Sequence, residues 1–385
     1  MAVPFADLLK QVVEQQASDL FITAGMPPAI KVHGRINPVG NEPLTADESR
    51  ATCYSIMNER QRSQFENELE CNFAIQPRAI GRFRVNVFVQ QGSVGMVLRR
   101  IESRIPTVAD LQVPKTLEDI AMIKRGIALM VGGTGTGKST TLAAMVGHRN
   151  RNSSGHIVTI EDPIEYVHEH GGCIITQREV GVDTHSFDHA LKNTLRQAPD
   201  VILIGEVRTR EGMEHAIAFA ETGHLCMATL HANNANQALD RIINFFPEER
   251  RPQLLMDLSL NLKAVVSQRL LPTPDGSGRR AAVEIMLNSP LISELIRKGA
   301  VHEIKGVMSR SRELGMRTFD QALFDLYKEG AISYDEAIAN ADSQNELRLL
   351  IKLDTEGSAA EVARKVKGFK VQQDDEPDPL QRFRR

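Results

Sequence analysis

A glycine-rich segment constrains this chain more than any other feature. It reads GGTGTGKS from Gly132 to Ser139 and follows a continuous apolar run, IALMV, at residues 127–131. The run is typical of a buried parallel strand, and helical sequence follows at 138–150. Glycines let successive backbone N–H groups turn toward an anion, and the amino end of a helix adds partial positive charge. The spacing G-x-x-x-x-G-K-S therefore predicts a phosphate-binding loop between a strand and a helix.

The expected ligand of this loop is ATP with Mg²⁺. Lys138 is expected to reach the β- and γ-phosphates, and Ser139 is expected to ligate the metal. A glycine-rich turn that binds nothing is the alternative, and the flanking strand and helix argue against it. The predicted nucleotide-binding residues are Gly132, Gly133, Thr134, Gly135, Thr136, Gly137, Lys138, Ser139 and Thr140.

Hydrolysis of the nucleotide needs an oriented water and positive charge near the γ-phosphate. The strand-like segment VILIGEV carries Glu206 at its end, which is the usual place of a water-activating carboxylate beside such a loop. Gly205 stands where many P-loop ATPases have a metal-associated Asp, so another acidic group must assist the metal. The segment IEDPIEY offers Glu161, Asp162 and Glu165, for which a solvated acidic turn is an equally good interpretation.

Two arginines and two histidines flank neighbouring strands. Arg196 precedes VILIGEV and Arg208 follows it, and both are candidates to stabilise phosphate charge. A pair of surface arginines is nevertheless the more common situation. The segment TGHLCMATLH places His224 and His231 at the two ends of another strand, where histidines are more often hydrogen-bonded structural residues than catalysts.

The composition argues against several function classes. The net charge is −3, whereas a sequence-independent nucleic-acid binder usually has a large basic excess. Cys53, Cys71, Cys173 and Cys226 form no CxxC pair, so reduced, partly buried thiols are expected rather than a zinc site or a redox motif. No apolar run approaches the ~18 residues of a membrane span, and the first residues lack a signal-peptide pattern. Any membrane role would therefore be peripheral, through a partner.

The pattern along the chain predicts an α/β protein. Residues 1–101 read as a small domain with a helix over 46–69 and a half-buried hairpin formed by FRVNVFVQ and VGMVLRRI. Residues 102–116 contain two prolines and are interpreted as a linker. Over residues 117–288 short apolar runs alternate with helical stretches, which predicts a parallel sheet covered on both faces. AVVSQRLL and RAAVEIML are expected to close the sheet as a pair of strands.

The remainder of the chain divides into a helical part and a polar tail. Residues 289–353 are predicted to be helical, with helices near 289–298, 303–311, 318–328, 333–340 and 344–353. Residues 354–385 are charged, contain few large apolar side chains and are expected to be mobile. No internal repeat is present in the sequence.

Several ordered segments together resemble one family, the type II/IV secretion ATPases, over about residues 3–345. IEDPIEY resembles the family's Asp box, VILIGEVR its atypical Walker B in which Gly precedes Glu, and TGHLCMATLHANNA its His box. ASDLFITAGMPPAIKVHGRI and GRFRVNVF resemble its PAS-like N-terminal domain. The paired-CxxC zinc module of pilus assembly members is absent from the sequence, which favours the PilT/PilU twitching-motility branch. NSPLISELIRKGAVHEIK, HANNANQALDRIINFFP and the longer charged tail are more similar to PilU-type members, which assist PilT.

The resemblance implies an α/β fold with a PAS-like N-terminal domain, a RecA-like P-loop core and a helical C-terminal extension. It implies a hexameric ring in which each ATP lies between two domains and is assisted by a neighbouring subunit. The candidates to reach a neighbour's nucleotide are Arg82, Arg84 and Arg99 together with Arg100, and solvated strand arginines are an equally good interpretation. The predicted catalytic set is Glu206, Glu161, Glu165, His231, His224, Arg196 and Arg208, with Mg²⁺ held by Ser139 and, through water, by Glu161.

The implied function is an ATP-hydrolysing motor that powers or assists type IV pilus retraction. The implied partners are an inner-membrane pilus platform protein and a paralogous PilT-type ATPase, and neither nucleic acid nor zinc is expected. The implied location of the chain is the cytoplasm, at the inner membrane through its partners. Two rival interpretations remain at this point. A RecA-type nucleic-acid motor would share the core fold and would be stimulated by DNA, and an ATP-bound accessory subunit would modulate a partner motor without turnover of its own.

Overall fold

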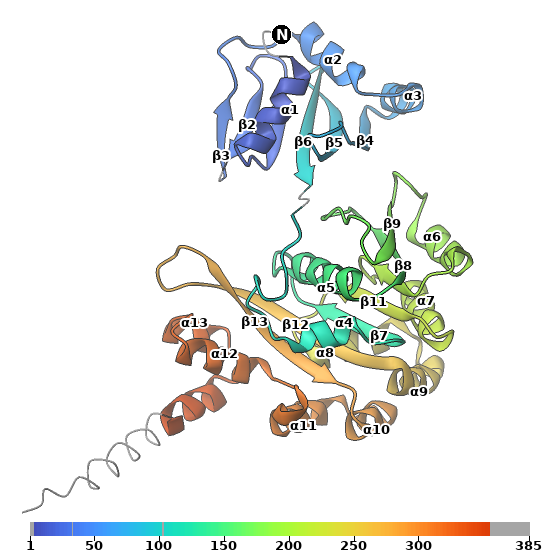
Figure 1. The fold of residues 1–385 in the computed structure, drawn as a ribbon, viewed down its shortest axis with the longest axis vertical. Coiled ribbons are helices and arrows are strands. Elements are labelled where there is room, and N and C mark those ends of the chain that lie inside the picture. Colours follow the sequence, from blue (N-terminus) through green and yellow to red (C-terminus); the bar gives the residue numbers. More distant parts are fainter. Residues whose placement is uncertain (1–3, 33, 102–103, 355–385) are drawn as a thin grey trace, which may run out of the picture. The chain divides into compact units, whose positions relative to one another are not determined.

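The computed structural model describes residues 4–32, 34–101 and 104–354. The chain divides into two compact units (Figure 1). Of the described residues, the first unit contains those up to Leu271 together with Arg279–Thr318, and the second contains Pro272–Gly278 and those from Phe319 to Asp354. The predicted mobile tail lies outside the described residues, apart from Asp354.

The N-terminal part of the first unit is built on a six-stranded antiparallel sheet. Its order is β3-β2-β1-β6-β5-β4, and the predicted hairpin is confirmed because β5 pairs antiparallel with β6. Strand β4 was not predicted, and it pairs with β5. The strands are β1 Asp19–Ile22, β2 Ala29–Val32, β3 Arg35–Pro38, β4 Glu70–Ile75, β5 Arg82–Gln90 and β6 Ser93–Ile101, and the helix that precedes them is α1 Phe5–Glu14.

The single helix predicted over 46–69 is wrong. The segment forms α2 (Ala46–Ser55) and α3 (Glu59–Glu68). The break is at Asn58, whose side chain accepts a hydrogen bond from the Gln61 N–H while the Gln61 side chain accepts one from the Asn58 N–H, each at 2.9 Å. This reciprocal capping box begins a new helix.

A seven-stranded sheet forms the core of the first unit, in the order β13-β12-β7-β11-β10-β8-β9. The strands from β12 to β9 pair in parallel, which confirms the predicted parallel sheet, and β13 lies beside β12 as the predicted closing pair. The strands are β7 Gly126–Val131, β8 Gly155–Glu161, β9 Cys173–Glu179, β10 Val201–Ile204, β11 Leu225–Leu230, β12 Leu262–Pro272 and β13 Arg279–Leu287.

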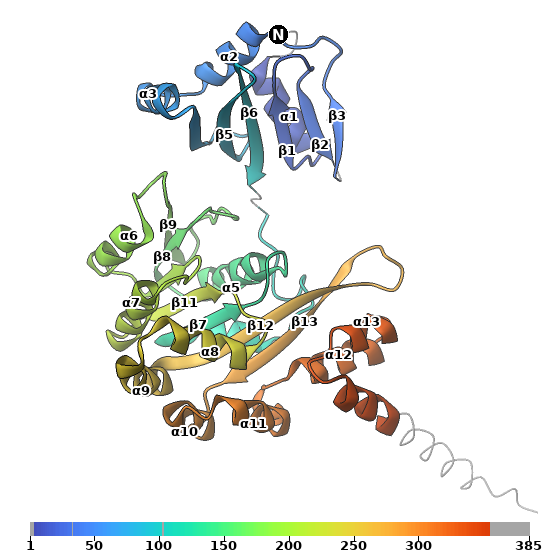
Figure 2. The ribbon, with the colours of Figure 1, turned by 180° about the vertical axis from the view of Figure 1, so that it is seen from behind.

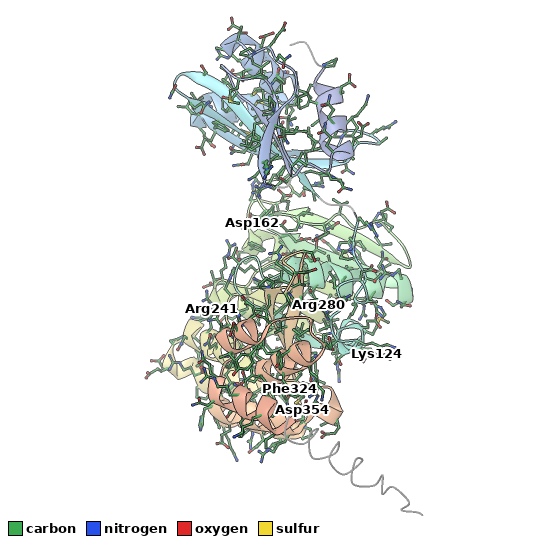
Figure 3. All side chains as sticks on the ribbon, turned by 90° about the vertical axis from the view of Figure 1, so that its left-hand side faces the viewer. Lys124, Asp162, Arg241, Arg280, Phe324 and Asp354 are labelled. Atoms are coloured by element: carbon green, nitrogen blue, oxygen red, sulfur yellow. The ribbon has the colours of Figure 1, made fainter. Side chains whose placement is uncertain are left out.

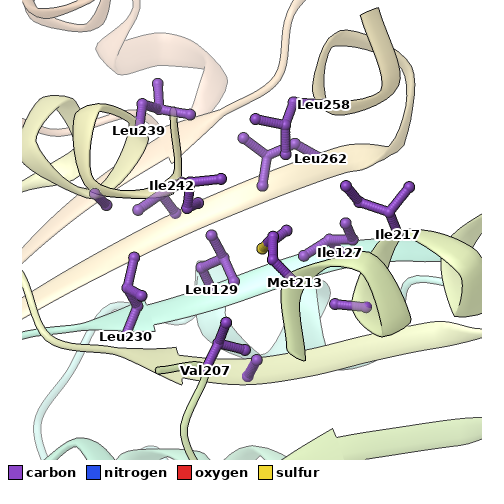
Figure 4. Close-up of a cluster of buried hydrophobic side chains, with 14 of the residues drawn as sticks. Ile127, Leu129, Val207, Met213, Ile217, Leu230, Leu239, Ile242, Leu258 and Leu262 are labelled. Atoms are coloured by element: carbon purple, nitrogen blue, oxygen red, sulfur yellow. The ribbon is translucent and has the colours of Figure 1, made fainter. Parts of the chain in front are cut away.

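Both faces of this sheet are covered by helices because successive side chains of each strand point to opposite faces. Ile127, Leu129 and Val131 of β7 face one buried cluster, which Figure 4 shows in close-up. Ala128 and Met130 face the other cluster. The first face is covered by α6 Phe187–Thr194, α7 Arg210–Glu221, α8 Ala235–Phe245, α9 Arg251–Asn261, α10 Pro290–Lys298 and α11 Ile304–Arg310, and the second by α4 Thr116–Ala121 and α5 Lys138–Asn152. Figure 2 shows α8 and α9 on the face opposite to α4 and α5 of Figure 1.

The second half of the segment interpreted as a linker packs on the core. Val108 and Val113 are buried in the same cluster as Leu117 of α4 and Met130 of β7. These residues are therefore anchored to the second face of the sheet. The remaining short elements of the first unit are the 3₁₀ helices η1 Leu195–Gln197, η2 Glu248–Arg250, η3 Val301–Glu303 and η4 Arg312–Leu314.

The second unit is helical. It contains α12 (Phe319–Lys328) and α13 (Tyr334–Ala339), and residues 344–354 are also helical. The helices predicted near 318–328, 333–340 and 344–353 are thus confirmed, as are those near 289–298 and 303–311 in the first unit. Among the described residues, no helix combines the length and apolar character that a membrane crossing requires.

The four cysteines are all buried and unpaired, as the sequence predicts. Burial raises the pKa of the Cys53 and Cys226 thiols to about 12. Burial also raises the pKa of Cys71 above its usual range. The thiols of Cys53, Cys71 and Cys226 therefore stay protonated and behave as small apolar side chains.

One buried arginine ties α5 to α4. Arg149 is 9% exposed and donates hydrogen bonds of 2.8 Å to the carbonyl oxygens of Ala121 and Ile123. These carbonyls lie at the end of α4, where helical partners are lacking. Arg149 thus satisfies the carbonyl of the buried residue Ala121 and that of the half-buried residue Ile123.

We expect Arg149→Met to lower the free energy of unfolding by about 2–4 kcal/mol, because two charge-assisted hydrogen bonds are lost and two carbonyls are left unpaired. Arg151→Met is the matched control, since Arg151 is on the same helix and exposed, and it should change stability by less than about 0.5 kcal/mol. Chemical denaturation measures both. Equal stability of the two variants would contradict the role given to Arg149.

Candidate functional site

A cleft of about 670 Å³ opens where the parallel strands of the core sheet end. Parallel strands place their carboxyl ends at one edge of a sheet, and ligands of such sheets bind outside that edge. The predicted residues that line the cleft are Arg100, Thr134, Gly135, Gly137, Lys138, Ser139, Thr140, Glu161, Asp162, Glu165, Glu206, Arg208 and His231. The structure therefore brings the glycine-rich loop together with all the acidic candidates, two arginines and one histidine.

The glycine-rich loop connects β7 directly to α5, as predicted. The Lys138 ammonium donates hydrogen bonds to the carbonyl oxygens of Gly132 (2.8 Å) and Gly133 (2.6 Å). An ammonium has three donors, so one N–H is left for a phosphate oxygen. Burial lowers the pKa of Lys138, and the Glu206 carboxylate opposes that shift. Gly132, Gly133 and Thr136 do not line the cleft and serve the internal bonding of the loop, which includes a bond from the Thr136 hydroxyl to the Gly133 carbonyl.

The helix that follows the loop presents its amino end to the cleft. Helix α5 has 15 residues and begins at Lys138, with Gly137 in the left-handed region as its N-cap. The unpaired N–H groups of such an end attract anions. Thr140 in the first turn is hydrogen-bonded to the Tyr166 hydroxyl at 2.9 Å, which ties the helix start to the segment that follows β8.

Glu206 lies two residues beyond the end of β10, and its carboxylate is held by two side chains. Arg208 donates from Nε to Oε2 at 2.7 Å, and Nε2 of His231 lies 3.2 Å from Oε1. The Glu206 side chain is only 16% exposed. Glu206 raises the pKa of the Arg208 guanidinium through this bond. The pair therefore keeps a carboxylate oriented beside the phosphate loop.

Gly205 stands where many P-loop ATPases have an Asp, and its backbone is closely packed against the end of β8. Its N–H donates to the Ile160 carbonyl at 2.7 Å, and its carbonyl accepts from the Thr229 hydroxyl. A Cβ at this position would lie 3.0 Å from Glu161 Cα and 3.1 Å from the Ile160 oxygen. A side chain at position 205 would therefore require the backbone at the end of β8 to shift by a few tenths of an ångström. Glu161 of the adjacent strand also lines the cleft and offers an acidic group there.

The Glu161 carboxylate at the end of β8 accepts hydrogen bonds from side chains of β8 and of β9. The Thr159 hydroxyl donates to Glu161 Oε1 at 2.7 Å, and Gln177 Nε2 donates to the same oxygen at 3.2 Å. Gln177 also donates to the Tyr166 carbonyl and accepts from the His168 N–H. Burial raises the pKa of Glu161, and the hydrogen bonds from Thr159 and Gln177 oppose that rise. Gln177 thus fixes both the acid and the loop after it.

The rest of the acidic segment also faces the cleft. Asp162, labelled in Figure 3, is 38% exposed and lies 3.9 Å from the Arg208 guanidinium. Glu165 lines the cleft and is exposed. Burial lowers the pKa of His168 to about 4, so this cleft residue is neutral at physiological pH and adds no positive charge.

The structure does not bring Arg196 and His224 to the cleft. Arg196 is exposed on η1, before β10 begins. His224 precedes β11, and its Nδ1 is hydrogen-bonded to the Thr222 hydroxyl (3.0 Å) and the Phe219 carbonyl (3.1 Å). Residues that precede a parallel strand lie at the amino edge of the sheet, opposite the cleft. The structural interpretation of His224 therefore fits its contacts, and only His231 is placed near Glu206.

The arginines predicted to act on a neighbouring subunit lie on the N-terminal sheet. Arg84 of β5 is directly opposite Arg99 of β6. Arg99 forms a 2.8 Å ion pair with Asp19 of β1, and Arg82 is at the beginning of β5. Their action on another subunit stays a prediction.

Several cleft residues were not predicted from sequence. They include Tyr166, His168, Thr229, Leu270 and Arg279. Tyr166 is the last residue of the acidic segment IEDPIEY and His168 comes two residues later, so proximity in sequence could have indicated them. Leu270 and Arg279 come from β12, which lies beside β7, and from β13, which lies beside β12; the sheet order rather than a motif sets these places.

The donor set of the cleft fits a magnesium ion. Among the residues that the structure describes, no group of three or more His, Cys, Asp or Glu side chains could hold a metal by itself. Magnesium bound with a nucleotide needs only one or two protein oxygens, because phosphates and water supply the others. Ser139 and Glu161 both line the cleft and offer oxygens of that kind.

The parallel sheet, the glycine-rich loop and the Glu206 carboxylate beyond the end of β10 define a P-loop ATPase with a RecA-like core. The chain matches the family model described as type II/IV secretion system protein over residues 4–305. It belongs to that family, as the resemblance of its motifs predicts.

The relatives and solved structures agree with this assignment. The chain is 61% identical over 380 residues to the type IV pilus ATPase PilU of Pseudomonas aeruginosa, which covers 99% of this chain and 100% of PilU. It is 42% identical over 331 residues to PilT of the same organism, a retraction ATPase, covering 86% and 96% of the two chains. The crystal structure of the pilus retraction motor PilT with bound ADP matches with a TM-score of 0.84 and 39% identity over 90% of this chain and 99% of PilT. The family, the α/β fold and the ATPase class are therefore established, and nucleotide binding follows from them.

We expect Gly205→Ala to lower the ATPase rate at least tenfold, because the added methyl group meets two backbone atoms and must displace Glu161 from Glu206. Overpacking of this kind costs about 1–3 kcal/mol of stability. Gly212→Ala is the matched control, since a Cβ there meets nothing closer than 3.7 Å, and in helix α7 alanine should stabilise by about 0.5–1 kcal/mol. Steady-state turnover and thermal unfolding are measured for both. Wild-type turnover by Gly205→Ala would show that the close approach of β8 and β10 has no catalytic importance.

Proposed function

We propose that this chain is an ATP-hydrolysing motor of the type IV pilus machinery that powers or assists pilus retraction and twitching motility. The observation that carries the proposal is the meeting of Lys138 and Glu206 in one cleft, in a chain that is similar to PilU over its full length. Lys138 can bind the triphosphate, and Glu206 can orient the attacking water.

Binding begins with the phosphates at the loop. The N–H groups at the start of α5 and the free donor of Lys138 bind the β- and γ-phosphate oxygens. Ser139 and Glu161 would hold Mg²⁺, Glu161 through water, and the ion would neutralise phosphate charge. The neutral imidazole of His168 and the Tyr166 hydroxyl complete the wall of the cleft.

Hydrolysis then depends on the Glu206 carboxylate. One of its oxygens orients the attacking water and accepts the proton that the water loses. Arg208 and His231 hold that carboxylate in place. Arg208 is in addition near enough to the cleft to meet negative charge that develops on the γ-phosphate.

Work on the pilus requires assembly. The chain forms a hexameric ring in which Arg82, Arg84 and Arg99 of the N-terminal sheet approach a nucleotide of a neighbouring subunit. ATP binding joins the N-terminal domain to the core through the triphosphate charge, and hydrolysis releases it as a hinge motion. The ring acts in the cytoplasm on an inner-membrane platform protein, with no nucleic acid as a partner.

A second candidate is an accessory role beside a paralogous PilT-type ATPase. The higher identity to PilU, 61%, than to PilT, 42%, favours it. The ATPase rate of the purified chain, alone and mixed with the paralogue, separates the two roles. An independent motor hydrolyses ATP alone, whereas an accessory subunit changes the rate of its partner. Stimulation by DNA would instead support a nucleic-acid motor.

We expect Glu206→Gln to reduce turnover by roughly 10²–10⁴-fold, the usual contribution of a general base, while ATP binding remains. Glutamine keeps the size of the side chain but cannot accept the proton. Glu214→Gln is the control, because Glu214 is on α7 and pairs with Arg210 away from the cleft. Phosphate release and the binding of a fluorescent ATP analogue are measured for each variant.

The same pair of variants tests the cellular role. In cells that lack the gene, Glu214→Gln should restore twitching motility and Glu206→Gln should not. Normal turnover by Glu206→Gln would refute the catalytic assignment. Normal motility of the deletion strain, with its pilus machinery intact, would refute the role in retraction and leave the ATPase assignment standing.

We expect Lys138→Ala to weaken nucleotide binding by about tenfold to a hundredfold, since a charge-assisted hydrogen bond to phosphate contributes about 1.5–3 kcal/mol. Turnover should be lost as well. Lys192→Ala is the control because Lys192 is on α6 and pairs with Asp188. Isothermal titration with ADP decides the matter, and unchanged affinity would remove Lys138 from the phosphate site.

A further inference from the structure

A buried glutamine of β12 lies directly behind the phosphate-binding loop. Ser267 of β12 is in register with Val131, the last residue of β7, so Gln268 is level with the first glycine of the loop. Gln268 is 2% exposed, and it does not line the cleft. Its amide therefore acts on the loop from inside the protein.

Both ends of this amide are used by the loop and its helix. Gln268 Nε2 donates to the carbonyl of Thr136 in the loop at 2.8 Å. Gln268 Oε1 accepts from the hydroxyl of Thr141 in the first turn of α5, also at 2.8 Å. A single side chain thus joins the loop and the helix start to the neighbouring strand.

Two glycines of the motif make this contact possible. A Cβ on Gly132 would lie 2.7 Å from the Gln268 carbonyl oxygen, and a Cβ on Gly137 would lie 2.8 Å from Gln268 Nε2. Neither distance leaves room for a side chain. The glycines at these positions therefore serve the packing on β12 in addition to the approach of phosphate.

The energetic argument concerns the ordering of the loop. A net hydrogen bond contributes about 0.5–1.5 kcal/mol, and a buried carbonyl that loses its donor costs about 1–3 kcal/mol. A loop of small residues that is not held in place must be ordered when the ligand binds, and that cost lowers affinity. Contacts that fix the loop before binding remove the cost.

We propose that Gln268 is a positioning residue for nucleotide binding, which holds the loop Gly132–Gly137 and the start of α5 in the phosphate-binding conformation through Thr136 and Thr141. It does not touch the nucleotide. The inference needs only nucleotide binding by this chain and is independent of the proposed role in pilus retraction.

A positioning role predicts a particular kinetic pattern. The loop contacts phosphate in the ground state and in the transition state, so loosening it removes binding that is common to both. Such a change raises KM and leaves kcat unchanged. A merely structural role would lower the melting temperature without this division between KM and kcat.

The test uses the full-length chain with Gln268→Met, Thr141→Val and the double variant. Methionine and valine keep the volume of the original side chains but cannot form the hydrogen bond. We expect Gln268→Met to raise the Kd for a fluorescent ADP analogue and the KM for ATP about tenfold, equivalent to 1.4 kcal/mol, with kcat within about twofold. The double variant should be no more than about twofold worse, because the two residues share one hydrogen bond.

Ser267→Ala is the matched control on the same strand. The Ser267 hydroxyl is fully buried and, among the described residues, has no hydrogen-bond partner, so its removal should leave Kd and KM unchanged. If Gln268→Met does not fold, Thr141→Val alone decides, with an expected increase of at least threefold in Kd. A Kd within twofold of wild type in the folded variant, or effects of the two substitutions that multiply fully, would overturn the proposal.

Discussion

The site depends on the common direction of β7, β8, β10 and β11. Because these strands are parallel, the residues that follow them meet at one edge of the sheet. The phosphate loop follows β7, Glu161 ends β8, Glu206 follows β10, and His231 follows β11. Residues that are distant in the sequence thereby become neighbours without any long loop. The hydrogen bond from the Gly205 N–H to the Ile160 carbonyl extends the pairing of β8 and β10 up to the residues that precede Glu161 and Glu206.

Two glutamines that do not face the ligand hold the segments that do. The acidic segment is fixed by Gln177 of β9, and the phosphate loop is fixed by Gln268 of β12. Both glutamines use their amide as donor and as acceptor, and neither lines the cleft. The flanking strands of the sheet therefore act as a scaffold, and the strands between them carry the chemistry.

The sequence predicts the parts of this structure that local chemistry controls. The loop Gly132–Ser139, the parallel sheet and Glu206 are recognisable because each is written in a short, continuous segment. Gln177 and Gln268 are not, since their partners are far away in the sequence and depend on the order of the strands. The predicted helix over 46–69 failed because Asn58 can cap a helix, which a search for apolar spacing does not detect.

The distinction between the two edges of the sheet could have been predicted. Arg196 and His224 precede their strands, whereas Arg208 and His231 follow theirs. In a parallel sheet that order alone assigns the first two to the edge opposite the ligand. The N-terminal arginines are different, because no local pattern tells which subunit they serve.

The burial of all four cysteines has a practical consequence for the study of motion in this protein. Only a thiolate reacts readily with maleimides and similar reagents, and the native thiols are inaccessible, with the pKa of Cys53 and Cys226 at about 12. A single cysteine introduced at an exposed position would therefore be labelled against a quiet background. Spectroscopic rulers attached in this way need no cysteine-free variant, so the conformational cycle can be followed in the otherwise unaltered chain.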